Sequence, residues 1–199
     1  QIRTPLSAAM LYAGHLCDSE LSKEQTQRFS EKIQSRLIHL EQQVKDMLIF
    51  VRGEVKLTDA VTTNELMIDL ESAIEVLIEN ADASYHITNA CPELCVQCNR
   101  ESMIGALVNL VNNGVQAVSK KPALIEISVQ QTASGEIQID VMDNGDGISE
   151  QVLASLDEPF YTTKTQGTGL GLAIVRAVVK AHHGHFNLCR QSNTGCCAS

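Results

Sequence analysis

Two glycine-rich turns, separated by a short gap, constrain the fold of this chain more than any other feature. The first, residues 143–147, follows an alternation of apolar and polar residues that predicts a strand over 136–141. The second, residues 167–171, opens a mostly apolar run that predicts a buried helix over 170–182. Glycines let a backbone approach a ligand closely, and the free N–H groups at a helix start favour phosphate. The two turns in this order therefore predict a nucleotide site.

Neither turn is specific by itself. The glycines of residues 167–171 do not form the dinucleotide-binding pattern Gly-x-Gly-x-x-Gly, and no strand–helix–strand unit surrounds them. They do not form a Walker P-loop either, because the Gly-Lys-Ser/Thr ending is missing. An ordinary glycine turn remains the alternative for each half, and the order of the two halves is what favours the nucleotide site.

A cluster of carboxamides interrupts the apolar pattern of the helix predicted over residues 100–118, for which Asn99 is the predicted cap. Asn109 and Asn113 are four residues apart and therefore share one face of that helix, and Gln116 follows them. Asparagine is a poor former of helix interiors, so its repetition needs a reason. A carboxamide oxygen can ligate Mg²⁺, which also takes phosphate oxygens from a substrate. A solvated polar face is the alternative that this pattern leaves open.

The charge balance and the cysteine count exclude some classes of function. A formal net charge of -9 offers no basic stripe for the phosphates of nucleic acid, so no nucleic-acid partner is expected. The sequence contains neither a signal peptide nor an apolar run of about 18 residues, so no membrane contact is expected in this segment. Seven cysteines, an odd number, fit reduced thiols in a cytoplasmic protein better than a disulfide framework.

Two groups of cysteines were candidates for special chemistry. Cys91, Cys95 and Cys98 match no four-ligand zinc spacing, and the last two are expected on opposite faces of a strand. The adjacent Cys196 and Cys197 are interpreted as part of a strand rather than as a redox pair. The sequence therefore predicts neither a zinc site nor a vicinal disulfide.

Residues 1–53 predict a helical hairpin. Apolar residues recur at alternating gaps of three and four in residues 1–17, and again through residue 51 after a short polar break. Ser22 and Gln25 have the spacing of a capping box that opens the second helix, and Gly53 ends it. A single hairpin cannot cover its own apolar stripe, so two copies are expected to pair as a four-helix bundle. Packing of the hairpin on the rest of the chain in a monomer is the alternative.

The heptad pattern stops at Gly53, and residues 54–199 predict a mixed α+β domain. Strands are expected at residues 55–57, 85–89, 94–97, 125–131, 136–141 and 185–189. Helices are expected at residues 64–80, 100–118, 150–156 and 170–182. Because strands and helices do not alternate strictly, the helices are expected to cover one face of a mixed sheet. The predicted fold class is α+β, with a hairpin domain at 1–53 and an α/β sandwich at 54–199.

Five sequence boxes in this order resemble sensor histidine kinases. The four boxes of the second domain are Asn109-x-x-x-Asn113, Asp143-x-Gly145-x-Gly147, Pro159-Phe160 and Gly167-x-Gly169-x-Gly171. Residues 1–6, Gln-Ile-Arg-Thr-Pro-Leu, resemble the box that follows the phospho-accepting histidine of that family. The resemblance covers nearly the whole chain and is strongest to kinases of the nitrogen-regulation and polar-flagellar type. It implies the ATP-binding fold shared with gyrase and the ninety-kilodalton heat-shock chaperone.

The resemblance implies ATP and Mg²⁺ as ligands. Asp143 would accept a hydrogen bond from the adenine amino group, Asn113 would ligate Mg²⁺ beside Asn109, and Lys164 would steady the γ-phosphate. The other positions implied to bind the nucleotide are Gln116, Gly145, Gly147, Ile148, Phe160, Thr163, Gly167, Thr168, Gly169, Leu170 and Gly171. Phosphoryl transfer needs positioning and charge neutralisation more than covalent chemistry from the protein, and this set fits that need.

The residues near the start of the chain are implied to serve the phosphate acceptor. The accepting histidine of the family would stand immediately before Gln1, so the chain as given is expected to bind ATP without phosphorylating itself. Gln1 replaces a glutamate of many relatives, and a carboxamide cannot take a proton. Gln1 and Thr4, one helical turn apart, are therefore expected to orient a histidine or a water by hydrogen bonds. Gln116 replaces a basic residue of many relatives, which weakens one expected phosphate contact.

Together, these features predict the kinase core of a two-component sensor that regulates flagella. The core would be a homodimer that passes phosphate from a histidine to an aspartate of a response-regulator receiver domain. A phosphotransfer-dead dimeric scaffold, a phosphatase acting on the regulator, and a gyrase-like or chaperone-like ATPase are the alternatives. The last class usually needs a catalytic glutamate near Asn109, whereas Glu101 is two helical turns away.

Overall fold

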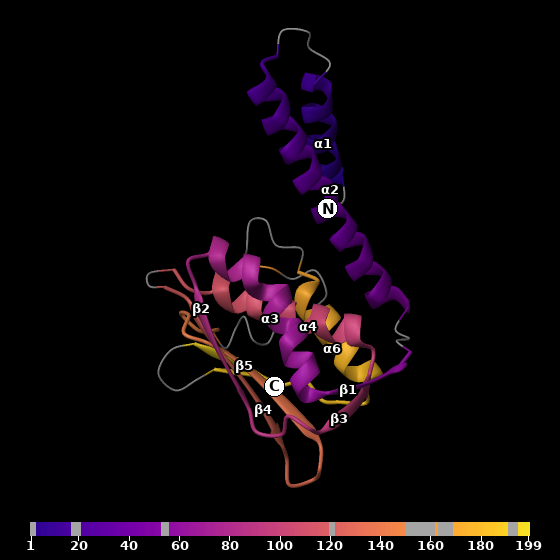
Figure 1. Cartoon of the computed structure of the whole chain (residues 1–199), viewed down its shortest axis with the longest axis vertical. Helices are drawn as coiled ribbons and strands as arrows, with labels where there is room; N and C mark the ends of the chain where they lie inside the picture. Colours follow the sequence, from indigo (N-terminus) through magenta and orange to yellow (C-terminus); the bar gives the residue numbers. More distant parts are fainter. Residues whose placement is uncertain are drawn as a thin grey trace. The chain divides into compact units, whose positions relative to one another are not determined.

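The chain is organised as two compact units. The structure, a computed structural model, describes residues 3–16, 21–52, 56–119, 122–149, 162, 169–190 and 195–199. The first unit is Gln1–Val51 and the second is Arg52–Ser199 (Figure 1). The helix predicted over residues 150–156 lies outside the described residues. Among the described residues, no helix combines the length and apolarity that crossing a membrane requires.

The first unit is the predicted helical hairpin, made of α1 (Arg3–Leu16) and α2 (Lys23–Arg52). The predicted capping box at the start of α2 is confirmed, because the Ser22 backbone N–H donates to Gln25 Oε1 at 2.9 Å and the Gln25 N–H donates to Ser22 Oγ at 3.2 Å. Phe29 of α2 stacks on Tyr12 and His15 of α1, with ring centroids 6.1 and 5.3 Å apart. These aromatic contacts join the two helices near their connection.

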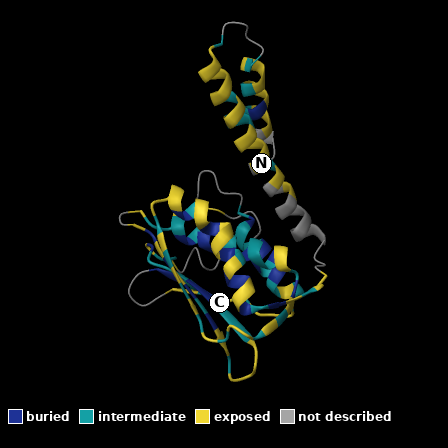
Figure 2. Ribbon diagram, in the orientation of Figure 1, coloured by how far each residue is buried: buried dark blue, intermediate teal, exposed yellow. Residues whose placement is uncertain are grey.

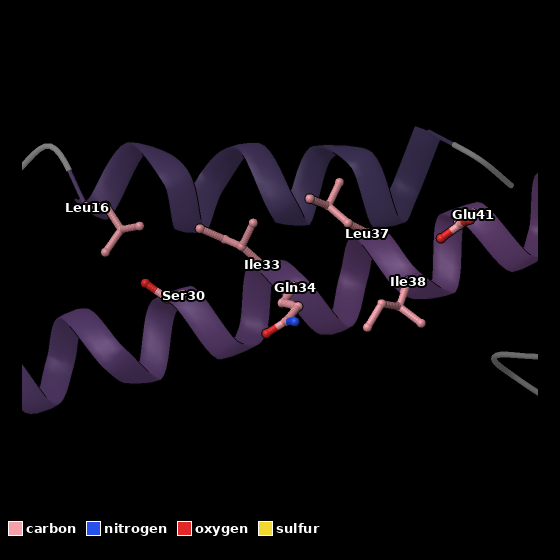
Figure 3. Close-up of a pocket in the computed structure, with 7 residues that line it drawn as sticks. All are labelled: Leu16, Ser30, Ile33, Gln34, Leu37, Ile38 and Glu41. Carbon is pink, nitrogen blue, oxygen red and sulfur yellow. The ribbon is translucent and has the colours of Figure 1, made fainter.

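Most of the apolar stripe of the hairpin is not covered within one chain (Figure 2). Ala9 is the one buried apolar residue among the hairpin side chains that the structure describes. Large apolar side chains that stay exposed are Leu6, Met10, Leu11, Leu37, Ile38 and Val44. An open hollow of about 400 Å³ also runs along α2, with Leu16, Ile33 and Leu37 on its walls (Figure 3). The hairpin therefore lacks the burial that a stable core requires.

The second unit is built on a five-stranded mixed sheet with the strand order β2-β4-β5-β7-β6. Its strands are β2 (Ser84–Asn89), β4 (Leu124–Gln131), β5 (Ile137–Asp143), β6 (Leu188–Arg190) and β7 (Cys196–Ala198). β2 and β4 are parallel, and the other neighbouring pairs are antiparallel. A separate antiparallel pair joins β1 (Asp59–Thr62) to β3 (Cys95–Cys98).

Three helices, α3 (Thr63–Asn80), α4 (Arg100–Gln116) and α6 (Gly171–Ala181), cover one face of this sheet (Figure 1). α4 lies centrally and contacts α3, α6, β4 and β5. The core between the layers is formed by fully buried aliphatic side chains, among them Leu66, Leu70, Ile74, Val111, Ile125, Ile127, Val129, Ile174, Val175 and Val178. The prediction of helices layered on one face of a mixed sheet is confirmed.

Local polar contacts set where the helices begin. The predicted cap of α4 is confirmed, because Asn99 Oδ1 accepts from the Ser102 N–H at 3.0 Å. α3 begins with a capping box of Thr62 and Glu65 that the sequence analysis missed. Side-chain oxygens in these positions satisfy backbone donors that the first helical turn leaves unpaired.

Two predicted strands are wrong in position. Residues 56–57 are not in a strand; β1 begins at Asp59, because the ladder with β3 starts where Asp59 lies opposite Cys98. The strand predicted over 185–189 begins only at Leu188, where pairing with β7 starts. Two smaller predictions are confirmed: Cys95 is exposed while Cys98 is buried, and Cys196 lies in a short strand.

Candidate nucleotide site

Asp143 ends β5 and is the charged group of the candidate site. Its carboxylate is half-buried, and Oδ1 accepts the backbone N–H groups of Gly145 at 2.8 Å and Cys196 at 3.3 Å. Burial raises the pKa of the Asp143 carboxyl above its usual range, and the two N–H donors oppose that rise. Both of these hydrogen bonds use Oδ1, and none to Oδ2 is found among the described residues.

The glycine turn after Asp143 is fastened to the end of α4. The Asp146 N–H donates to Ala117 O at 3.2 Å, and Ser119 Oγ donates to Asp146 Oδ2 at 2.6 Å. A Cβ on Gly145 would lie 2.8 Å from the same Ala117 oxygen, so this close approach requires glycine. Gly147 has φ +77°, a conformation that L side chains rarely adopt. The fold itself therefore requires glycine at both positions of this turn, independently of the ligand that the sequence resemblance implies.

Asn144 fixes the other side of this turn, which the sequence analysis did not predict. Its Oδ1 accepts from the Leu124 N–H at 3.0 Å, and its Nδ2 donates to Pro122 O at 3.2 Å. The turn is thus held by the start of β4 as well as by α4. An asparagine between an aspartate and a glycine indicates a turn, but not these partners, which lie 20 and 22 positions away in the chain.

Gly114 lets α4 cross the end of β5 at Asp143. A Cβ on Gly114 would lie 2.8 Å from Ile125 Cδ1 and 3.1 Å from Asp143 Cβ. This glycine was not predicted to matter, although a glycine inside a helix costs about 1 kcal/mol relative to alanine and so suggests a packing reason. The contact places Gly114, the neighbour of Asn113 in the chain, against the side chain of Asp143.

The two glycines of α4 provide a matched prediction on stability. Gly105→Ala is expected to stabilise the chain by about 1 kcal/mol, since nothing lies within 4 Å of the new Cβ and alanine favours helix. Gly114→Ala is expected to destabilise it by about 1–3 kcal/mol, because the new methyl meets the fully buried Ile125 and the Asp143 Cβ. Denaturant unfolding measures both changes. Equal shifts in the same direction would contradict the close packing at Gly114.

The predicted carboxamides lie at the start of α6. A Cβ on Gly171 would lie 3.6 Å from Asn113 Nδ2 and 3.8 Å from Asn109 Oδ1. The side chain of Leu170, the N-cap residue of α6, makes no capping hydrogen bond, and the start of the helix carries the positive end of the helix dipole. Both asparagines are half-buried, which does not fit the alternative of a fully solvated polar face.

The C-cap residue of α6, His182, also fixes the register of this helix against α4. His182 Nε2 accepts the Asn99 N–H at 2.9 Å, and its Nδ1 lies 2.7 Å from Val178 O. The end of α6 is thereby tied to the start of α4. The sequence analysis did not predict this role, which depends on residues 83 positions apart.

The predicted Asn109 and Asn113 approach the predicted Gly171, and Gly114, the neighbour of Asn113, approaches the predicted Asp143. Predicted residues that are also described in this region are Gly147, Ile148, Gly169 and Leu170. Gln116 is exposed and donates to Asn112 Oδ1 at 3.0 Å. Thr4 lies in α1. Predicted residues that lie outside the described ones are Gln1, Phe160, Thr163, Lys164, Gly167 and Thr168.

Comparisons with known proteins identify both units. Residues 98–199 match the family of histidine kinase-, DNA gyrase B- and HSP90-like ATPases, and residues 1–55 match the His Kinase A (phospho-acceptor) domain. The sensor protein kinase FleS of Pseudomonas aeruginosa is 44% identical over 200 residues, which cover 100% of this chain and 48% of FleS. The chain thus spans about half the length of this curated relative, and the match agrees with the resemblance to polar-flagellar kinases.

Two solved structures share the fold. The nucleotide-free catalytic domain of histidine kinase ThkA is 27% identical, with a TM-score of 0.62, and the match covers 70% of this chain and 91% of that domain. ThkA in complex with the response regulator protein TrrA is 22% identical with a TM-score of 0.66, covering 99% of this chain and 57% of ThkA. The chain therefore belongs to the sensor histidine kinases, as its sequence boxes and its α+β architecture predicted.

Proposed function

We propose that the second unit binds Mg-ATP and that the chain is the kinase core of a two-component sensor. The observation that carries this proposal is the pair of contacts that α4 makes, with the end of β5 at Gly114 and with the start of α6 at Asn109 and Asn113. A half-buried carboxylate ends β5, two carboxamides stand on α4, and the N-terminus of α6 lies beside those carboxamides. Each element suits a different part of a nucleoside triphosphate.

The Asp143 end of the site is proposed to hold adenine. Oδ2 of Asp143 would accept a hydrogen bond from the exocyclic amino group of the base, while Oδ1 stays bonded to Gly145 and Cys196. The glycine turn of Gly145 and Gly147 is proposed to bring its backbone close to the base. A carboxylate requires a donor on the base edge, so this end favours adenine over guanine, whose corresponding position is a carbonyl.

The α4–α6 end of the site is proposed to hold the phosphates and Mg²⁺. In the described part of the chain no cluster of three or more His, Cys, Asp or Glu side chains comes together. A cation here is proposed to be held by the Asn113 carboxamide, beside Asn109, and by phosphate oxygens, because carboxamide and phosphate oxygens suit Mg²⁺. Bound Mg²⁺ supplies charge neutralisation on the phosphates, and the N–H groups at the start of α6 orient them. Lys164 is proposed to reach the γ-phosphate.

The phosphate is proposed to pass to a histidine immediately before Gln1 and then to an aspartate of a response-regulator receiver domain. Gln1 and Thr4 would orient that histidine, or a water when the regulator is dephosphorylated. The fold shared with ThkA, which was solved with the regulator TrrA, supports this class of partner. The match of residues 1–55 to the phospho-acceptor domain supports the role of the hairpin. A cytoplasmic location is proposed with this partner.

The hairpin is proposed to pair with a second copy as a four-helix bundle. Its exposed leucine, isoleucine and methionine side chains and the open hollow along α2 are apolar surface without cover in one chain (Figure 3). Contiguous apolar surface of this kind marks an interface between proteins. Sedimentation equilibrium should give twice the chain mass, and a monomer at micromolar concentration would contradict this pairing.

Isothermal titration calorimetry with ATP tests the proposed nucleotide site. One ATP is expected to bind per chain in the presence of Mg²⁺, and chelation of the metal is expected to weaken that binding. A phosphotransfer-dead scaffold would show no binding. A gyrase-like or chaperone-like ATPase would bind ATP but would also hydrolyse it steadily without a protein acceptor. Such an ATPase usually needs a glutamate near Asn109, whereas Glu101 lies in the first turn of α4, far from Asn113. Absence of binding would overturn the proposal.

A further inference from the structure

Two cysteines of the second unit lie directly opposite each other on neighbouring strands. Cys189 of β6 is the register partner of Cys197 of β7. Asn187 and Ser199 exchange two backbone hydrogen bonds at 2.8 and 2.9 Å, and two residues further along, Cys189 and Cys197 occupy the same kind of pair. The Cα atoms of such a pair are about 5.5 Å apart, within the range of about 4.4–6.8 Å that disulfides span.

Both thiols lie on the face of the sheet opposite the helices. Cys196 and Ala198 are buried on the face of the sheet that the helices cover. Because successive residues of a strand point to opposite faces, Cys197 points to the uncovered face, and so does Cys189, which lies opposite it. Cys189 is exposed and Cys197 is half-buried. Neither thiol has a role in the proposed nucleotide site.

The two thiols differ in their surroundings. Burial raises the pKa of Cys197, and the neighbouring Cys189 and Asp140 raise it further, although Ser199 opposes the rise. Cys197 Sγ also lies 3.9 Å from Ser199 Oγ. Burial raises the pKa of Cys196 to about 12, and this thiol faces the core. Exposed Cys189 is thus the thiol that a solvent oxidant reaches, and Cys197 is the thiol beside it.

We propose that Cys189 and Cys197 form a redox pair that hydrogen peroxide converts to a cross-strand disulfide. The Cys189 thiolate attacks one peroxide oxygen, the O–O bond breaks, and water leaves after protonation, so that Cys189 becomes a sulfenic acid. Cys197 then attacks the Cys189 sulfur, the S–O bond breaks, and a second water leaves. Two thiols and one peroxide give one disulfide and two waters, and a dithiol reductant reverses the change.

The disulfide is positioned to affect Asp143. Directly opposite Cβ atoms in such pairs are about 5.5 Å apart, whereas a disulfide holds them at about 3.8 Å, so bond formation draws β6 and β7 together. β7 shares three register pairs with β6 but only two with β5. The Cys196 N–H, next to the new bond, donates to Asp143 at the long distance of 3.3 Å. This hydrogen bond is therefore the first contact of the site to be lost on oxidation.

Peptide mapping of the peroxide-treated 199-residue chain tests the bond. The expected product is a peptide pair that joins Cys189 to Cys197, absent after dithiothreitol and absent in both Cys189→Ser and Cys197→Ser. Cys95→Ser is the control, because Cys95 is also exposed but lies in the separate two-stranded sheet, and this variant should still form the bond. A bond between any other two cysteines, or sulfinic acid at Cys189 without a bond, would overturn the proposal.

Calorimetry with Mg-ATP tests the consequence, which rests on the proposed function. The oxidised chain is expected to bind Mg-ATP about tenfold more weakly than the reduced chain, because the loss of one hydrogen bond to a charged group has an effect of this size. Cys189→Ser should bind Mg-ATP equally before and after peroxide. Equal affinity of the oxidised and reduced chains would overturn the link to Asp143. A reduced chain that binds no Mg-ATP would contradict the proposed function instead, and the mapping alone would then decide on the disulfide.

Discussion

A chain extended by one histidine before Gln1 is expected to retain label from γ-labelled Mg-ATP, and Asn113→Ala is expected to slow that labelling about a thousandfold. The reason is electrostatic. Phosphoryl transfer places negative charge on the phosphate oxygens, and the bound cation is what neutralises it. Asn113 stands beside the first turn of α6 and is the proposed protein ligand of that cation. Acid hydrolyses phosphohistidine, so the protein should be separated from ATP, and its labelling measured, at alkaline pH.

Asn112→Ala is the matched control for Asn113→Ala. Asn112 is the same residue type on the same helix, but its Oδ1 accepts from Gln116 Nε2 at 3.0 Å. The two variants remove the same carboxamide at adjacent positions and change helix propensity equally. Asn112→Ala should therefore keep most of the labelling rate. Equal losses in both variants would mean that the effect comes from the stability of α4, and the proposed metal contact would be wrong.

Local signals explain why so much of the fold was predictable. Ser22 and Gln25 form the expected capping box, and Asn99 caps α4 as expected. Such contacts join residues only three positions apart, so sequence spacing contains nearly all the information that they need. The apolar periodicity of α4 and the alternation in β4 and β5 likewise depend on each element and the face that it buries.

The errors and omissions share one cause, which is dependence on distant partners. β1 was placed too early because its start is set by pairing with β3, about 40 residues away in the chain. The importance of Gly114 depends on where Asp143 and Ile125 lie in the folded sheet. The site could be predicted as a set of boxes, but the sequence could not show that Gly114 is where α4 and β5 meet. Only the packed structure supplies that contact.

Asp143→Asn is expected to weaken Mg-ATP binding by about 10–100-fold, as for the loss of a hydrogen bond to a charged acceptor. The amide oxygen of the variant can still accept the N–H groups of Gly145 and Cys196. The ligand-facing Oδ2, however, is exchanged for an NH₂ group that would meet the adenine amino group donor to donor. Asp146→Asn is the control in the same turn, because Asp146 is exposed and bonds Ser119 instead. It should leave the affinity within about twofold.

The same Asp143→Asn substitution should not destabilise the chain without nucleotide at neutral pH. Burial raises the folded-state pKa of Asp143 above the ordinary 3.8, so the folded chain binds more protons than the unfolded chain between the two values. The stabilising contribution of this group is complete below 3.8 and is lost as pH rises through the folded-state pKa. At pH 7 the ionised, half-buried carboxylate opposes folding, and the neutral amide removes that opposition.

Thermal unfolding should therefore give an equal or higher Tm for the variant at pH 7, and the difference should shrink below pH 3.8. A variant that is less stable at pH 7, and that binds Mg-ATP as tightly as the original chain, would show that Asp143 serves only the fold.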